Sequence, residues 1–119
     1  MPHDGSIVIV VGTNIPLTSN QLNRLARRAA LGLGRLGSYS GNRSGDAIVS
    51  FSTSSAASDK DQDRNMDAIF QATVEATEEA IVNALVGART MTGADGLRIY
   101  AISHEELRTV LGKYNRLNP

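Results

Sequence analysis

The chain has 119 residues, a usual length for one small domain with a modest hydrophobic core, so we expect residues 1–119 to form a single domain. The 12 Lys and Arg residues balance the 12 Asp and Glu residues, which gives no sign of a nucleic-acid-binding or membrane-binding protein. The absence of cysteine excludes disulfides and thiolate catalysis, and without a signal-peptide pattern or an apolar run of roughly 18 residues we expect a cytoplasmic protein.

A run of five β-branched residues, Ile7–Val11, predicts the first strand. Both alternating faces of this run are apolar, which is typical of a strand that is covered on both sides in a layered structure. Ser6 lies at the start of the strand, directly after Gly5, which lets the backbone bend sharply. Ser6 is either an ordinary turn residue or a nucleophile, and the spacing alone favours the turn residue.

A helix is predicted next, because Thr18 and Gln21 form a capping-box pattern and apolar residues then recur at helical spacing to about Gly37. Residues 38–45 are dense in Ser, Gly and Asn and predict a loop. Residues 46–53 alternate between apolar and polar residues more than the first strand does and predict a second strand.

Three further elements are expected in the second half of the chain. They are a helix from about Met66 to Arg89, a strand over Leu97–Ile102 after a turn at 92–96, and a short helix capped by Ser103 that reaches about Tyr114. The first of these helices is expected to turn seven residues inward, namely Ile69, Phe70, Val74, Ala80, Ile81, Ala84 and Leu85.

The resulting order of strand, helix, strand, helix, strand, helix predicts an α/β layered unit. If the helices cover one face of the sheet, the other apolar face of the first strand stays open, and an open apolar face is costly. We therefore expect a second layer to be supplied from elsewhere.

Chemically useful residues occur at the starts of the first two strands: Gly5 and Ser6 at one, Ser44 and Asp46 at the other. The starts of parallel strands lie at the same edge of a sheet, so these groups are expected to converge. A hydroxyl nucleophile, a second hydroxyl and a carboxylate suit nucleophilic catalysis. If the Gly5–Ser6 bond were cut, Ser6 would gain an α-amino group with a pKa of about 7.7–8.0, a usable base near neutral pH. From geometry alone, the turn serine remains the favoured interpretation and the nucleophile the alternative.

Two other patterns superficially match cofactor sites. The glycines of Gly32–Gly37 have the spacing of a dinucleotide fingerprint, but they close a helix instead of linking a strand to a helix start. The acids of Asp59–Asp63 begin like a calcium loop, but Arg64 stands where that loop needs glycine. The two histidines, His3 and His104, are not spaced as a metal pair, so we expect no metal site.

Several blocks carry a resemblance to a known family. In chain order they are Gly5–Val11, Pro16–Leu17, Gln21–Leu33, Ser44–Asp46, Phe51–Thr53, Glu78–Leu85 and Met91–Gly96. Together they resemble the self-processing aminopeptidases, a family that includes D-aminopeptidase, L-aminopeptidase/D-esterase and the β-peptidyl aminopeptidases. The similarity covers nearly the whole chain and is weakest in 54–65.

The resemblance implies an αββα sandwich and a serine aminopeptidase that releases N-terminal residues from short peptides, amides or esters. Family precursors cut themselves at a Gly–Ser bond, so Gly5–Ser6 matches the cleavage site, after residues 1–5, and Ser6 matches the nucleophile. Ser44 and Asp46 match the serine and the acidic residue that support it. No metal or organic cofactor is implied, and neither is a nucleic-acid or membrane partner. The preference for D-, L- or β-residues differs between members.

The resemblance also implies an α-subunit portion as partner, with αβ units assembled into a homo-oligomer. This sequence matches only the smaller β portion, whereas the α portion of the family supplies the oxyanion donors and much of the substrate pocket. Loss of one oxyanion donor can lower kcat by about 10²–10³, so we expect this chain to be inactive by itself. The alternatives are a non-catalytic α/β association module and, with a weaker match, acyl transfer like that of the ornithine acetyltransferases.

Overall fold

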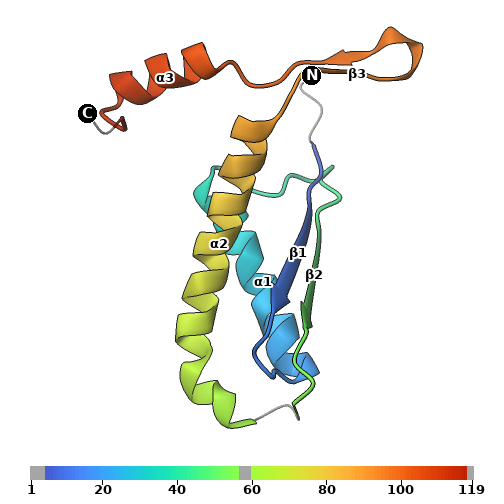
Figure 1. Cartoon of the computed structure of the whole chain (residues 1–119), viewed down its shortest axis with the longest axis vertical. Coiled ribbons are helices and arrows are strands. Elements are labelled where there is room, and N and C mark those ends of the chain that lie inside the picture. Colours follow the sequence, from blue (N-terminus) through green and yellow to red (C-terminus); the bar gives the residue numbers. More distant parts are fainter. Residues whose placement is uncertain (1–4, 57–59, 118–119) are drawn as a thin grey trace. The chain divides into compact units, whose positions relative to one another are not determined.

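A computed structural model describes residues 5–56 and 60–117 of the chain (Figure 1). In chain order the elements are β1 (Val8–Thr13), α1 (Ser19–Arg35), β2 (Ala47–Ser52), a 3-10 helix η1 (Lys60–Asn65), α2 (Met66–Gly87), β3 (Met91–Thr92), a 3-10 turn η2 (Ala94–Gly96), β4 (Arg98–Ile99) and α3 (His104–Lys113). The chain forms two compact units, of which the first extends to Glu79 and the second begins at Ala80. The mixture of strands and helices confirms the predicted α/β class.

Strands β1 and β2 form a parallel pair, with Val8 opposite Ala47 at one end and Thr13 opposite Ser52 at the other. Helix α1 is the crossover between them, as a parallel pair requires. The prediction of both strands is confirmed, although β1 begins one residue later and ends two residues later than the run of β-branched residues.

The capping box of α1 is present as predicted. The Thr18 hydroxyl accepts a hydrogen bond from the Gln21 N–H (3.2 Å), and the Gln21 side-chain oxygen accepts one from the Thr18 N–H (2.8 Å). The helix ends at Arg35, and Gly37 follows with a φ of 97°, a left-handed conformation that glycine adopts without strain. The prediction that this helix ends near Gly37 is therefore confirmed.

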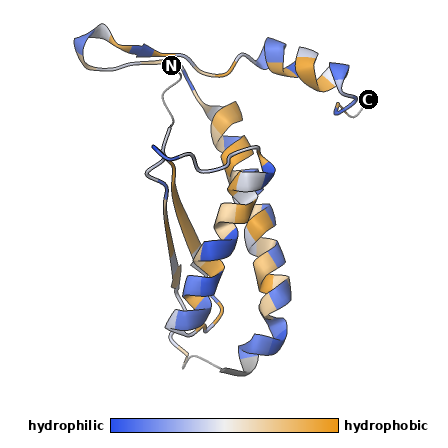
Figure 2. Ribbon diagram, turned by 180° about the vertical axis from the view of Figure 1, so that it is seen from behind, coloured by the Kyte–Doolittle hydropathy of each residue, from blue (hydrophilic) through white to orange (hydrophobic). Residues whose placement is uncertain are grey.

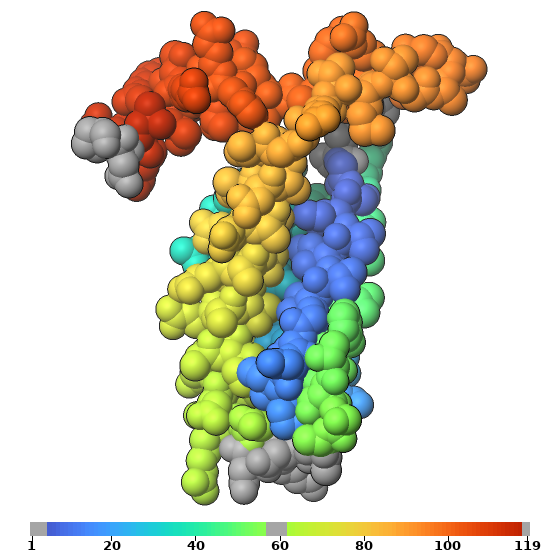
Figure 3. Space-filling view, in the orientation of Figure 1, coloured from blue at the N-terminus to red at the C-terminus, as the bar shows by residue number. Residues whose placement is uncertain are grey.

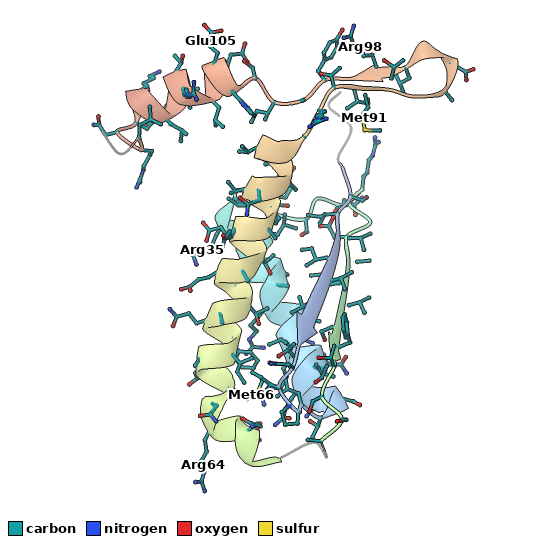
Figure 4. The ribbon with its side chains drawn as sticks, in the orientation of Figure 1. Arg35, Arg64, Met66, Met91, Arg98 and Glu105 are labelled. Atoms are coloured by element: carbon teal, nitrogen blue, oxygen red, sulfur yellow. The ribbon has the colours of Figure 1, made fainter. Side chains whose placement is uncertain are left out.

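The core of the first unit lies where α1 and the start of α2 pack against β1. Its buried side chains are Leu17, Leu25, Met66 and Phe70, and Val11 of β1 packs against them. Met66, at the first residue of α2, is labelled in Figure 4. Figures 1 and 2 both show α1 and α2 running alongside each other next to the strands. The first unit is therefore two layers, one of strands and one of helices.

Gly32 is a point at which α1 and α2 approach each other closely. A Cβ placed on Gly32 would lie 2.7 Å from the carbonyl oxygen of Val74 and 2.8 Å from the Cβ of Thr77. The glycine series at 32–37 therefore includes a contact between two helices and does not form a phosphate loop between a strand and a helix start.

The two faces of the parallel pair have an unexpected distribution of polarity. Val10 and Val49 point away from the helices and are 63% and 56% exposed. On the opposite face, the hydroxyl of Ser50 donates to the Leu22 carbonyl (2.7 Å) and that of Ser52 donates to the Ile15 carbonyl (2.6 Å). The serines therefore face the helices, while valines form a continuous apolar surface on the outside, completed by Val8 and Phe51.

This open sheet face agrees with the expectation that the helices cover only one side of the strands. Figure 2 shows that both strands are largely hydrophobic, and Figure 3 shows the strands at the surface of the first unit. Apolar side chains in such a contiguous patch usually mark a surface that another element covers.

The second half of α2 differs from the prediction. The helix begins at Met66 as expected and ends at Gly87, but Ala80, Ala84 and Leu85 are exposed instead of inward-facing. Among the described residues from 80 to 117, none is buried, so the second unit has no core of its own that these side chains join. The inward assignment of these three residues is wrong for this structure, whereas Phe70 is buried as predicted.

The third predicted strand, Leu97–Ile102, is present only as the two-residue strand β4, which pairs antiparallel with β3 and not with β1 or β2. The turn between them is tight because Asp95 and Gly96 both have positive φ, 57° and 74°. A short turn favours pairing between adjacent segments, and this explains why β4 forms a hairpin with the residues just before it.

The last helix agrees with its prediction. The hydroxyl of Ser103 accepts a hydrogen bond from the Glu106 N–H (3.2 Å), α3 begins at His104, and Tyr114 follows its last residue. Glu105 and Glu106 lie in its first turn, where the helix dipole favours negative charge.

Candidate functional site

The starts of β1 and β2 lie side by side because the strands are parallel and in register. Val8 pairs with Ala47, and the Ala47 N–H donates to the Ile7 carbonyl oxygen (3.0 Å). The residues just before the two strands, Ser6 on one side and Ser44–Asp46 on the other, therefore meet at one edge of the sheet. This convergence is what the strand order predicted.

Ser6 contacts the second strand start through its hydroxyl. The backbone N–H of Gly45 donates a hydrogen bond to Ser6 Oγ at 2.9 Å. Ser6 is exposed, so the hydroxyl is accessible from solvent. A Cβ placed on Gly45 would lie 3.2 Å from Ser6 Oγ, which is tighter than most carbon contacts. The missing side chain at residue 45 thus allows the backbone amide to approach the hydroxyl.

The carboxylate of Asp46 is held from two sides. One oxygen, Oδ1, accepts a hydrogen bond from the Ile7 N–H (3.0 Å), and the other, Oδ2, accepts one from the Ser40 hydroxyl (3.2 Å). The Asp46 carboxylate therefore holds the residue that follows Ser6 in the chain.

Hydrogen bonds also favour the ionised form of Asp46. Its pKa lies below the ordinary value of 3.8, firstly because the Ser44 hydroxyl donates to the carboxylate and secondly because the Ile7 N–H does. Partial desolvation opposes this effect, and the Ser40 hydroxyl adds to it. Asp46 therefore stays ionised to a lower pH than an ordinary Asp, and Ser44 is the main cause.

Ser40 is a member of this group that the sequence did not reveal. It lies in the loop between α1 and β2, where many residues are Ser, Gly or Asn, so its type and spacing give no signal. Its backbone conformation distinguishes Ser40 in the structure, because its φ of 48° is left-handed, which is uncommon for residues other than glycine. The loop also carries Ser44, whose N–H donates to the Gly41 carbonyl (2.8 Å).

A small hollow of about 150 Å³ adjoins the site. It is lined by Gly5, Gly37, Ser38, Tyr39, Gly41 and Ser44. A larger groove, of about 740 Å³, lies at the other end of β1, between residues 11–16 and one face of α2, and is remote from Ser6. The hollow beside Gly5 and Ser44 is therefore the one that belongs to the candidate site.

The arrangement has a definite chemical capacity. A backbone N–H that donates to a serine oxygen stabilises the negative charge that develops when the hydroxyl loses its proton. The Asp46 carboxylate reaches Ile7, the neighbour of Ser6, and so orients the chain at this point. The site can therefore present an oriented, exposed hydroxyl with a donor already aimed at its oxygen.

The acidic pattern that begins like a calcium loop has another use in this structure. Asp63 accepts hydrogen bonds from the Gln21 side chain (3.1 Å) and from Arg24 (3.2 Å), so it ties η1 to α1. Arg64 is exposed and points away from the core (Figure 4). Asp59 lies outside the described residues.

Of the two histidines, His3 lies outside the described residues, and Nε2 of His104 lies 2.9 Å from the carbonyl oxygen of Val86. Within 5–56 and 60–117, no three His, Asp or Glu side chains are grouped so that they could hold a metal ion. In the same ranges, no helix is sufficiently long and apolar to cross a membrane.

Comparisons with known proteins agree with these features. The chain is 44% identical to a β-peptidyl aminopeptidase BapA of Sphingosinicella microcystinivorans, over 98% of this chain and 32% of that protein. It is 43% identical to the BapA of Sphingosinicella xenopeptidilytica, over 92% of this chain and 30% of that protein.

Among solved structures, the chain is similar to the L-aminopeptidase D-Ala-esterase/amidase of Ochrobactrum anthropi, a prototype of the serine aminopeptidases and a variant of the Ntn hydrolase fold. The TM-score is 0.78 and the identity 39%, over 92% of this chain and 34% of that one. The chain thus spans about a third of the length of these relatives. The model of peptidase family S58 matches residues 1–99. Because that match includes both strand starts and most of the chain, this protein belongs to peptidase family S58.

Proposed function

We propose that this chain is the nucleophile-bearing portion of a serine aminopeptidase that cuts its own Gly5–Ser6 bond. The observation that carries the proposal is the hydrogen bond from the Gly45 N–H to Ser6 Oγ, at the edge where the two parallel strands begin. Membership of a peptidase family, with aminopeptidases among the relatives, supports the hydrolytic chemistry.

Self-cleavage follows from the position of Ser6 next to its own peptide bond. Ser6 Oγ loses its proton and attacks the carbonyl carbon of Gly5, and the Gly5–Ser6 C–N bond breaks as the Ser6 nitrogen takes up a proton. Water then hydrolyses the resulting ester, which leaves a carboxylate on Gly5 and both a free amine and a hydroxyl on Ser6. The Gly45 N–H stabilises the charge on Oγ during the attack.

Peptidase activity uses the amine that this cut creates. An α-amino group with a pKa of about 7.7–8.0 is partly neutral near pH 7, so it accepts the proton of the Ser6 hydroxyl. The serine attacks the first carbonyl of the substrate, the remainder of the substrate leaves with a proton, and water releases the N-terminal residue. The relatives support short peptides, amides or esters as the substrate class.

Ser44 and Asp46 support the nucleophile in this proposal. The ionised Asp46 carboxylate holds the Ile7 amide and thereby fixes the strand start that carries Ser6. Ser44 contributes a hydroxyl that lowers the pKa of Asp46 and so favours its ionised form. Both residues act through their neighbours, whereas Ser6 forms and breaks the covalent bonds.

The partner in this proposal is the α portion of the same enzyme. The outward face of β1 and β2, with Val10 and Val49 more than half exposed, gives that portion an apolar surface to cover. A chain that matches about a third of each relative is consistent with this division. We further propose a cytoplasmic homo-oligomer of αβ units, by analogy with the family.

The first test is the intact mass and N-terminal sequence of this chain after incubation with the complementing portion, which is the part of the Ochrobactrum anthropi protein outside the matched segment. We expect a new N-terminus at Ser6 and hydrolysis of an amino-acid p-nitroanilide. Ser6→Ala is expected to abolish both, whereas Ser55→Ala, at an exposed serine beyond β2, is expected to leave both unchanged. Cleavage that persists in the Ser6→Ala variant would contradict the proposal.

The alternative function is a non-catalytic module that works by association. The outward apolar face of the sheet favours it, since docking requires that surface and not the Ser6 hydroxyl. If the chain binds the complementing portion equally well with and without the Ser6→Ala substitution, and no cleavage or hydrolysis occurs in either case, the association module is supported.

A further inference from the structure

Ser40 connects the loop between α1 and β2 to the carboxylate at the start of β2. Its hydroxyl donates to Asp46 Oδ2 (3.2 Å), and its own N–H donates to the hydroxyl of Ser38 (3.2 Å). Both hydrogen bonds are exposed to solvent, so burial in the core does not hold these groups in place. Ser40 is thus bonded through its backbone to the loop and through its side chain to the strand.

The backbone conformation of Ser40 indicates that its side chain has a structural role. Its φ of 48° lies in the left-handed region, where glycine is favoured and other L-residues are strained. Gly37 and Gly41 lie close to it in the same loop, so glycine is a residue type that this loop readily uses. A strained serine in place of an unstrained glycine suggests a role for the hydroxyl.

The bond from Ser40 complements the bond from Ile7. Asp46 Oδ1 is held by the Ile7 N–H at the start of β1, and Oδ2 is held by Ser40 from the opposite side. With both oxygens engaged, the carboxylate has one orientation. Loss of the Ser40 bond leaves the Oδ2 side of the carboxylate less restrained and weakens its hold on Ile7, the residue next to Ser6.

We infer that Ser40 is a positioning residue, whose hydroxyl orients the Asp46 carboxylate and, through the Ile7 amide, the Ser6 nucleophile. The effect on cleavage rests on the proposed function, whereas the effect on Asp46 and Ile7 does not. The same hydrogen bond restrains one side of the hollow beside Gly5, because Tyr39 and Gly41, the neighbours of Ser40, line that hollow. The Ser40 hydroxyl also helps to keep the pKa of Asp46 low.

Two substitutions separate the hydroxyl from the backbone. Ser40→Gly removes the hydroxyl and relieves the left-handed strain, so a loss beyond that of a glycine control in the same loop comes from the missing hydrogen bond. Ser40→Asn restores a donor, the side-chain amide, on a residue that tolerates positive φ. Asn42→Gly, at an exposed position of the same loop, is the matched control.

The first measurement uses the full chain alone. The pKa of Asp46 is followed by the ¹³C shift of its carboxyl carbon, and the protection of the Ile7 amide is followed by hydrogen exchange. Ser40→Gly is expected to raise the pKa of Asp46 and to reduce the protection of Ile7. Ser40→Asn is expected to restore both in large part, and Asn42→Gly to leave both at the parent values. Unchanged titration and exchange in Ser40→Gly would overturn the inference.

The second measurement is the rate of Gly5–Ser6 cleavage with the complementing portion present. We expect Ser40→Gly to slow it by about tenfold or more, because small displacements of a nucleophile are costly, and Ser40→Asn to recover most of the rate. If the parent is cut and Ser40→Gly is cut equally fast, the positioning role fails while the proposed function stands. If the parent is not cut under conditions that permit association, the proposed function fails, and the first measurement still decides whether Ser40 orients Asp46.

Discussion

The backbone N–H of Gly45 donates a 2.9 Å hydrogen bond to the hydroxyl oxygen of Ser6, across 39 positions of sequence. Each residue lies two positions before the first residue of its strand, so the bond joins the two points at which the parallel pair begins. A side chain at residue 45 would disturb this contact, since its Cβ would lie 3.2 Å from Ser6 Oγ.

Gly45→Ala is expected to slow self-cleavage at Gly5–Ser6 by about tenfold or more, because the added methyl group displaces the hydroxyl while the N–H donor remains. The measurement is the cleavage rate by intact mass in the presence of the complementing portion. Gly34→Ala, where a Cβ would meet nothing within 4 Å, is the control. An unchanged rate in Gly45→Ala would show that the close approach is not needed for the reaction.

Asp46→Asn is expected to lower stability at neutral pH, because the amide carries no charge and donates where the carboxylate accepts. The pKa of Asp46 is lowered in the folded chain, so its contribution is present above the unfolded pKa of about 3.9 and is lost as the pH falls through the folded pKa. The urea midpoints of parent and variant are therefore expected to differ at pH 7 and to converge below about pH 4. Glu79→Gln, at an exposed position of α2, is the control. A difference that persists unchanged into acid would contradict the role of ionisation.

Two glycines of α1 are predicted to respond in opposite directions to alanine. Gly32→Ala places a Cβ 2.7 Å from the Val74 carbonyl oxygen, so α1 and α2 must separate, at a cost of about 1–3 kcal/mol in the free energy of unfolding. Gly34→Ala meets no neighbour and is expected to stabilise the helix by about 0.8–1.0 kcal/mol. Urea unfolding of both variants checks the prediction, and changes of the same sign in the free energy of unfolding would contradict it.

Val49→Thr is expected to affect assembly more than the stability of the chain. The side chain is 56% exposed on the outward sheet face, and threonine keeps its shape and β-branching while a hydroxyl replaces one methyl group. We therefore expect the unfolding free energy of the chain to change by less than about 0.5 kcal/mol, and its binding to the complementing portion to weaken measurably. Titration calorimetry is the measurement, and Thr53→Val, just beyond the end of β2 at an exposed position, is the reverse control. Equal binding by Val49→Thr and the parent would show that this face is not the docking surface.

The local elements were predictable because short-range interactions determine them. The capping box of Thr18 and Gln21, the cap of Ser103 and the β-branched strand each depend on residues within a few positions of one another. The meeting of Ser6 with Asp46's strand start also followed from the sequence, since a strand, a helix and a second strand in that order predict a parallel pair.

Tertiary structure alone decided which residues face which neighbours. The alternating pattern of β2 places Val49 and Ser50 on opposite faces of the strand. Only the Leu22 carbonyl group of α1, which accepts a hydrogen bond from Ser50, shows why the serine face is directed inward. The hydrogen bond from Ser40 to Asp46 could not be predicted from the sequence for a similar reason, because it depends on one left-handed residue in a loop. Likewise, β4 pairs with β3 since a tight turn brings them together. Residue types and spacing therefore determined the elements, whereas their faces and partners depended on surfaces that form only when distant parts of the chain are packed.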